Sequence, residues 1–130
     1  TFVLARTSND GAADLQEACT CDGTPLYRHV ARQVAAWSAD ADGTAGLVVG
    51  ATAPEALAEL RADAPTLPFL VPGVGAQGGD PADVMDAAAT EEGLVLVNSS
   101  RSILYASEEA DYADAAAGAA RSLRDALRSG

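Results

Sequence analysis

Short apolar runs alternate four times with longer stretches of helical periodicity along the 130 residues of the chain. The apolar runs predict strands at residues 2–6, 46–50, 68–71 and 94–98. Each run is nearly all apolar, as expected of strands that are covered on both faces of a sheet. Strands that alternate with helices favour an α/β fold with a parallel sheet over a helical bundle or a sandwich.

The segments between the predicted strands carry signals for helix starts. Thr24 followed by Pro25 predicts a capped helix whose apolar face includes Trp37. Asp80 followed by Pro81 predicts the start of another helix in the same way.

Two further helix starts are predicted from cap patterns. Thr52 with Glu55 forms a capping-box pattern, and Ser107 precedes the last helix, whose apolar stripe ends with Leu123 and Leu127. No linker divides the resulting pattern, so residues 1–130 are predicted to form a single segment of four βα units. Four such units fit either a small doubly wound sheet or half of a (β/α)8 barrel, which typically takes about 250 residues.

The loop after the third predicted strand is rich in glycine. Residues 72–81 read Pro-Gly-Val-Gly-Ala-Gln-Gly-Gly-Asp-Pro, and a helix follows directly. Glycines leave backbone amides unhindered and a helix N-terminus is electropositive, so we expect an anion here, with Gly78 among its donors. Gln77 is the one long polar side chain in this loop.

The same glycines also fit a dinucleotide-binding pattern. Gly73, Gly75 and Gly78 match G-x-G-x-x-G, and Arg101 follows the next strand, where it could meet a 2′-phosphate. The helix begins at Asp80, after all the glycines, whereas the fingerprint needs its last glycine within the strand–helix packing. An NADP-binding segment therefore remains an alternative hypothesis.

A second anion-binding feature follows the fourth predicted strand. Residues 98–104 are long enough for one helical turn, and Arg101 beside Ser100 offers a planar fork for two phosphate oxygens. Barrels often build a phosphate site from the loops after strands seven and eight plus a short helix. By this count the chain begins at strand five, which agrees with Thr1 opening directly into a strand.

Charge and composition narrow the classes of partner. The formal net charge is −11 and all eight basic residues are arginine, so the chain contains no lysine. A nucleic-acid-binding surface needs a basic stripe, so no nucleic-acid partner is expected. A carboxylate-rich surface suits concentrated salt, where self-repulsion is screened, so a halophilic source is our interpretation, with compositional drift in a GC-rich genome as the alternative.

The remaining sequence signals argue for little additional chemistry. No apolar stretch approaches a membrane span and no signal peptide is visible, so a cytoplasmic protein is expected. Cys19 and Cys21 have no partner pair for zinc or a disulfide framework, and we interpret them as reduced loop thiols. His29 is predicted to be a solvated residue, and neither a metal nor a cofactor is expected.

Four segments together resemble the bacterial-type orotidine 5′-phosphate decarboxylases. They are residues 2–11, 46–52, 72–81 and 98–105, in that family's order and spacing, and the glycine-rich loop is the most specific of them. The resemblance covers roughly residues 2–107 and implies the C-terminal half, strands five to eight, of a (β/α)8 TIM barrel. It also implies a lyase of pyrimidine biosynthesis that converts orotidine 5′-phosphate to uridine 5′-phosphate and CO2.

The resemblance assigns roles to individual residues. It implies that Ser8 and Gln77 contact the pyrimidine and that Gln77, Gly78, Ser100 and Arg101 contact the phosphate. The family's catalytic set, Asp-x-Lys-x-x-Asp with an upstream lysine, has no counterpart in this lysine-free chain. The resemblance therefore implies that the catalytic residues lie in a missing N-terminal half and that this chain alone is inactive.

Two alternatives besides the NADP-binding segment remain. One is another phosphosugar-binding barrel enzyme, and the other is a non-catalytic half-barrel that pairs with itself to cover its open edges. The expected partners of the leading hypothesis are the nucleotide substrate, the N-terminal half of the barrel and a second copy in a homodimer.

Overall fold

The strands of the sheet follow one another in the order of the sequence. The computed structural model describes residues 1–75 and 78–129. Its four parallel strands, in their order across the sheet, are β1 (Phe2–Arg6), β2 (Gly46–Val49), β3 (Phe69–Pro72) and β4 (Val95–Asn98). These bounds differ by at most one residue from the predicted ones. A doubly wound sheet reverses its order at a switch point, whereas a barrel keeps sequence order, so this sheet has the order of half a barrel.

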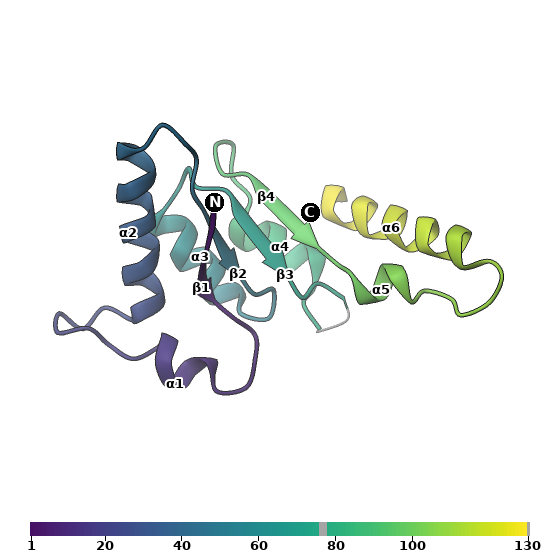
Figure 1. Ribbon diagram of the computed structural model, residues 1–130, viewed down its shortest axis with the longest axis horizontal. Coiled ribbons are helices and arrows are strands. Elements are labelled where there is room, and N and C mark those ends of the chain that lie inside the picture. Colours follow the sequence, from purple (N-terminus) through teal and green to yellow (C-terminus); the bar gives the residue numbers. More distant parts are fainter. Residues whose placement is uncertain (76–77, 130) are drawn as a thin grey trace.

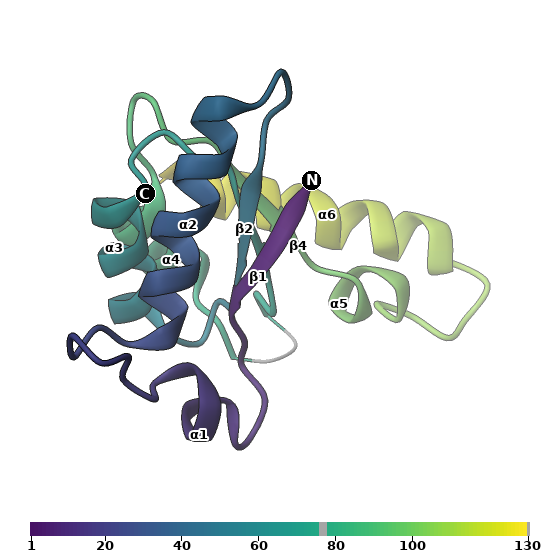
Figure 2. The same ribbon diagram turned by 60° about the vertical axis from the view of Figure 1, so that its left-hand side comes forward.

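Helices fill the connections between the strands. They are α1 (Ala12–Gln16), α2 (Leu26–Asp40), α3 (Pro54–Asp63), α4 (Pro81–Ala88), α5 (Arg101–Leu104) and α6 (Tyr112–Ser129). Helices α2, α3 and α4 cover one face of the sheet, and α6 extends past β4 (Figures 1 and 2). α6 packs against α4 and α5. This one-sided layer corresponds to the outer helical ring of a barrel.

The hydrophobic core lies between the sheet and these helices. Its largest fully buried side chains are Phe69, Leu47, Leu57, Leu60, Val34, Val49, Val71, Val74 and Val84. Burial of each such side chain stabilises the fold by roughly 1.5–3 kcal/mol. The core is therefore contributed by every second strand residue and by the inner faces of α2, α3 and α4.

The opposite face of the sheet is apolar but open. Leu4 pairs with Val48, Val48 with Leu70 and Leu70 with Leu96, which makes one row of side chains across all four strands. Leu4 is 57% exposed and Leu96 is 40% exposed. The strands were expected to be covered on both faces, but among the described residues only the face under the helices is covered. A layered row of branched apolar side chains is what fills the inside of a barrel.

The predicted helix starts at Asp80 and Thr24 have different outcomes. Asp80 is confirmed as a cap, because its Oδ1 accepts a hydrogen bond from the N–H of Ala82 at 2.7 Å. The prediction for Thr24 is wrong, because the carbonyl of Thr24 accepts from the N–H of Thr20 at 2.9 Å and α2 starts only after Pro25.

The other two cap predictions are also wrong. Ala53, and not Thr52, is the N-cap of α3, and it makes no side-chain cap bond. Ser107 accepts from the N–H of Glu109 at 3.1 Å and donates to Asp111 at 2.6 Å. These bonds form a turn before the last helix, which consequently begins at Tyr112.

Trp37 does not lie on the buried face of α2, contrary to the prediction. The residues of α2 that are buried are Tyr27, Ala31 and Val34, whereas Trp37 is 58% exposed. The buried stripe is therefore rotated relative to the predicted one, and it includes the small, fully buried Ala31.

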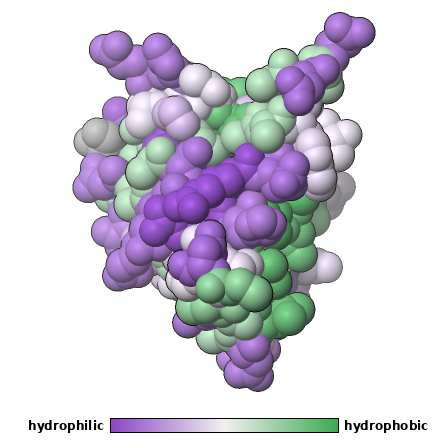
Figure 3. Space-filling model, turned by 90° about the vertical axis from the view of Figure 1, so that its left-hand side faces the viewer, coloured by the Kyte–Doolittle hydropathy of each residue, from purple (hydrophilic) through white to green (hydrophobic). Residues whose placement is uncertain are grey.

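A network of polar side chains joins α2 to α3. Arg28 Nε lies 2.6 Å from Asp63 Oδ2, Arg32 Nη2 lies 3.1 Å from Asp63 Oδ1, and the hydroxyl of Tyr27 donates to Glu59. The hydrogen bond from Arg28 holds the pKa of Asp63 below its usual range. Burial, followed by the bond to Glu59, raises the pKa of Tyr27 to about 12. Viewed from the side on which α2 lies, a hydrophilic band crosses the molecule (Figure 3).

Candidate functional site

The residues that were expected to bind a nucleotide follow the carboxyl ends of the strands. Ser8 comes after β1, Gly78 lies in the loop between β3 and α4, and Ser100 and Arg101 follow β4. Because the strands are parallel, these positions share one edge of the sheet. Gln77 lies outside the described residues. Barrel enzymes place their active sites at this edge.

The loops after β3 and β4 are tied together by serine side chains. Ser99 Oγ donates to the carbonyl of Val74 at 3.1 Å and lies 2.5 Å from Ser102 Oγ. A Cβ added to Gly75 would lie 3.4 Å from Ser102 Oγ, so the two loops are in direct contact. Sequence reasoning missed Ser99 and Ser102, although the Ser-Ser-Arg-Ser run after an apolar strand was a usable signal.

The glycine-rich loop also presses against the end of β2. A Cβ at Gly79 would lie 2.4 Å from the Cβ of Ala51, a distance that real atoms do not adopt, so only glycine fits there. Within the loop, the N–H of Gly78 donates to the carbonyl of Gly75 at 2.9 Å. A phosphate at Gly78 would therefore compete with an existing hydrogen bond.

Arg101 begins the one-turn helix α5 beside these loops. Its side chain is exposed, and within residues 1–75 and 78–129 no carboxylate lies at ion-pair distance from it. The turn itself is closed by the carbonyl of Ser100, which accepts from the N–H of Leu104 at 2.8 Å, while Ser100 Oγ donates to Asn98 Oδ1 at 3.3 Å. An arginine fork without a carboxylate partner, next to a glycine loop, suits a dianionic group such as a phosphate.

Ser8 lies at the other end of this edge, in a hollow of about 190 Å³. The hollow is lined by Leu4, Arg6, Thr7, Ser8, Asn9, Val48, Gly50 and Pro72. Its lining is apolar where the sheet face begins and polar at the strand end. Such a surface suits a flat ring with a hydrogen-bonding edge, which is the character of a pyrimidine.

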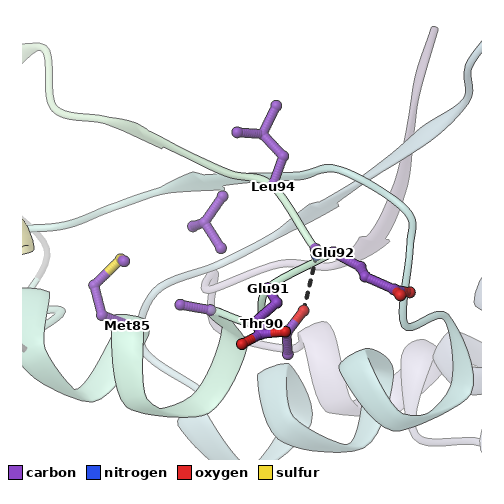
Figure 4. Close-up of a pocket in the computed structure, with 8 residues that line it drawn as sticks. Met85, Thr90, Glu91, Glu92 and Leu94 are labelled. Atoms are coloured by element: carbon purple, nitrogen blue, oxygen red, sulfur yellow. Dashed lines mark hydrogen bonds between the residues drawn. The ribbon is translucent and has the colours of Figure 1, made fainter.

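A larger hollow, of about 370 Å³, lies at the opposite end of β4 (Figure 4). It is lined by Met85, Glu91, Glu92 and Leu94 among others, and at its base Thr90 Oγ1 accepts from the N–H of Gly93 at 2.8 Å. Two carboxylates would repel an anion, and the amino ends of the strands are the stability face of a barrel. Size alone therefore does not identify the functional site.

Other candidate chemistry is sparse among residues 1–75 and 78–129. Cys19 and Cys21 are exposed and form no disulfide, and His29 is exposed. In this part of the chain, His, Cys, Asp and Glu nowhere gather in threes as a metal site requires. None of the helices described there combines the length and apolarity that crossing a bilayer demands.

Comparison with known proteins gives a consistent result. Residues 1–116 match the family described as Orotidine 5′-phosphate decarboxylase / HUMPS family. An orotidine 5′-phosphate decarboxylase from Paracidovorax citrulli is 52% identical, with 97% of this chain and 47% of that protein covered. One from Halobacterium salinarum is 50% identical, with 97% and 48% covered.

Solved structures agree with the sequence relatives. The UMP synthase of Leishmania donovani superposes with a TM-score of 0.79 at 43% identity, over 98% of this chain and 27% of that one. The OMP decarboxylase of the same organism superposes with a TM-score of 0.76 at 39% identity, over 97% and 47%.

The match decides between the two fold alternatives and shows how much of its relatives this chain covers. It supports half of a TIM barrel and excludes the dinucleotide-binding segment, in agreement with the strand order. The chain spans about half the length of the curated relatives it matches. By sequence and by fold, this chain belongs to the orotidine 5′-phosphate decarboxylase / HUMPS family.

Proposed function

We propose that this chain is the phosphate- and pyrimidine-binding half of an orotidine 5′-phosphate decarboxylase. The complete enzyme converts orotidine 5′-phosphate to uridine 5′-phosphate and CO2. The observation that carries the proposal is the pair of loops joined by Ser99, with Arg101 exposed beside them. The names of the relatives, orotidine 5′-phosphate decarboxylase, support the same substrate.

In this proposal the chain binds both ends of the nucleotide. Arg101 and Ser100 bind the 5′-phosphate together with Gly78, Ser8 contacts the pyrimidine edge, and Gln77 reaches both. Binding energy from the remote phosphate helps to assemble and close the site around the ring.

The chemical step requires groups that this chain does not contain. Loss of CO2 leaves carbanion character on the ring, which a nearby ammonium must stabilise and protonate. The chain contains no lysine, so the ammonium must come from the half of the protein that the relatives carry in addition.

That other half is also the proposed partner of the open sheet face. The row from Leu4 to Leu96 would be covered when four further strands close the barrel. Each Å² of apolar surface removed from water would contribute roughly 25 cal/mol. We further expect the complete protein to act in the cytoplasm as a homodimer, which is the commonest symmetric assembly.

Decarboxylation assays on two samples test the proposal. The chain alone should show no enzymatic turnover of orotidine 5′-phosphate, whereas the chain joined to an N-terminal half, such as that of the Halobacterium salinarum relative, should release CO2. Turnover by the chain alone, free of contaminating enzyme, would refute the assignment of roles. A joined protein that folds but neither binds uridine 5′-phosphate nor turns over substrate would refute the function.

A further inference from the structure

The end of β1, which leads into Ser8, is held by a side chain rather than by the sheet. The pairing of β1 with β2 is irregular between Leu4 and Arg6, and the carbonyl of Arg6 accepts from the N–H of Gly50 at 2.8 Å. Beyond this point, the N–H of Thr7 donates to Gln16 Oε1 at 2.9 Å. The amide of Gln16 thus takes the place of a neighbouring strand.

Gln16 holds Thr7 by both ends of its amide. Gln16 Nε2 donates to Thr7 Oγ1 at 2.8 Å. A backbone N–H can only donate, so Oε1 must face Thr7 N and Nε2 must face the hydroxyl. Arg6 Nη1 donates to the same Oε1 at 3.2 Å, and Arg6 Nη2 lies 2.5 Å from Glu17 Oε1. These bonds anchor α1 to the strand end.

Gly50 confines the same segment from the side of β2. A Cβ added to Gly50 would lie 3.1 Å from both the backbone nitrogen and the Cβ of Ser8. Such a contact is tighter than most, so the backbone of Ser8 has little room to move toward β2. Residues 7 and 8 are therefore held between the amide of Gln16 and the bare backbone of Gly50.

The held segment forms a wall of the proposed pyrimidine site. The hollow of about 190 Å³ and an adjacent one of about 180 Å³ share Arg6, Thr7, Ser8 and Asn9 in their linings. Gln16 lines neither hollow. A change at Gln16 would therefore act on a ligand through the position of Thr7 and Ser8.

We propose that Gln16 is a positioning residue that sets where Ser8 meets the pyrimidine edge of the nucleotide. The inference rests on the proposed function and extends it to a residue outside the ligand's reach. It requires that Gln16 influence binding of the base and leave binding of the phosphate, at the Arg101 end, unchanged.

The test compares two ligands by calorimetry in the complete barrel, that is, this chain with an N-terminal half. Gln16→Leu should weaken uridine 5′-phosphate about tenfold, since two hydrogen bonds to Thr7 are lost, and should change ribose 5-phosphate by less than about twofold. Gln16→Glu should recover most of the affinity, because a carboxylate still accepts from the Thr7 N–H. The Thr7 hydroxyl, which accepts from Gln16, can rotate its hydrogen and donate to the carboxylate instead. Gln33→Leu, at an exposed position of α2, is the matched control.

Each outcome decides the inference. Equal weakening of both ligands, or none, in Gln16→Leu would overturn it and leave the proposed function intact. Absence of uridine 5′-phosphate binding in the unsubstituted barrel would overturn the function, and the inference with it. If Gln16→Leu does not fold, Thr7→Val removes one of the two bonds, and about threefold selective loss of the nucleotide is expected; an unchanged ratio of the two ligands would again overturn the inference.

Discussion

Two arginines at opposite ends of the sheet have opposite surroundings. Arg61, in α3, is 5% exposed, and its guanidinium donates to the carbonyls of Ala88 at 2.8 Å and Leu67 at 2.7 Å. It also reaches the carbonyls of Ala64, Pro65 and Leu94. Arg101 is exposed at the carboxyl edge and pairs with no carboxylate among residues 1–75 and 78–129.

The difference separates a structural arginine from one that we propose binds the phosphate. Arg61 donates hydrogen bonds to the chain segments that lead into β3 and β4. Its guanidinium carbon lies 3.7 Å from the centre of the Phe69 ring. A Cβ at Gly93 would lie only 2.5 Å from that guanidinium carbon, so glycine is needed there. Burial lowers the pKa of Arg61, yet arginine remains charged because its ordinary pKa is so high. The amino ends of the strands are therefore organised for stability, whereas the carboxyl ends carry an exposed cation, which binds the phosphate in the proposed function.

The substitution expected to change stability most is at the buried arginine, Arg61. Arg61→Met should lower the free energy of unfolding by about 3–4 kcal/mol, because several buried carbonyls lose their donors. Urea unfolding measures this, with Arg121→Met on the exposed surface of α6 as the control. A loss no greater than that of the control would show that backbone carbonyls at this end do not depend on Arg61.

A smaller effect is expected at the ion pairs between α2 and α3, which lie between these extremes of burial. Asp63 is 11% exposed and is bound by Arg28 and Arg32, so Asp63→Asn should cost about 1–2 kcal/mol at pH 7. Because the pKa of Asp63 is lowered in the folded protein, its contribution is present above the unfolded value near 4 and is lost as the pH falls through the folded value.

Urea unfolding at pH 7 and pH 3 checks this sign. The difference between the unsubstituted chain and Asp63→Asn should be large at pH 7 and should shrink at pH 3. A difference that grows on acidification would mean that the carboxylate is not stabilised by the two arginines.

The smallest of these effects is expected from salt, which should act differently on the two ends of the sheet. Raising KCl to molar concentration should increase the melting temperature by several degrees, because screening relieves repulsion in a chain of net charge −11. The same salt should weaken nucleotide binding at exposed Arg101 and leave the cost of Arg61→Met unchanged, since buried bonds are little screened. A flat or falling melting temperature would remove the argument for a halophilic source.

The elements that the sequence predicted correctly depend on local patterns. The strands were recognisable as dense apolar runs, and Asp80 with Pro81 needs only the next residues to make its cap. The caps at Thr24 and Ser107 failed because neighbouring loop residues form turns with them, which a cap pattern does not show.

The residues that sequence reasoning missed have partners that no helix or strand periodicity indicates. Arg61 bonds to carbonyls up to Leu94, and Gln16 bonds back to Thr7, so neither role is visible in a local pattern. One signal existed for Arg61, because it follows Leu60 on the buried side of α3, where a charge needs a special partner. The predicted roles of Ser8, Gln77, Gly78, Ser100 and Arg101 remain predictions.

Phosphate binding by Arg101 is tested most directly by Arg101→Ala in the complete barrel, measured by binding of uridine 5′-phosphate and of uridine. We expect the nucleotide to lose about 2–3 kcal/mol of binding free energy, uridine to be hardly affected, and Arg101→Lys to recover only part of the loss. Gln77→Ala should be milder, because it removes a neutral contact. Equal weakening of nucleotide and nucleoside by Arg101→Ala would contradict phosphate binding by Arg101, since Arg101 would then be structural and the phosphate site misplaced.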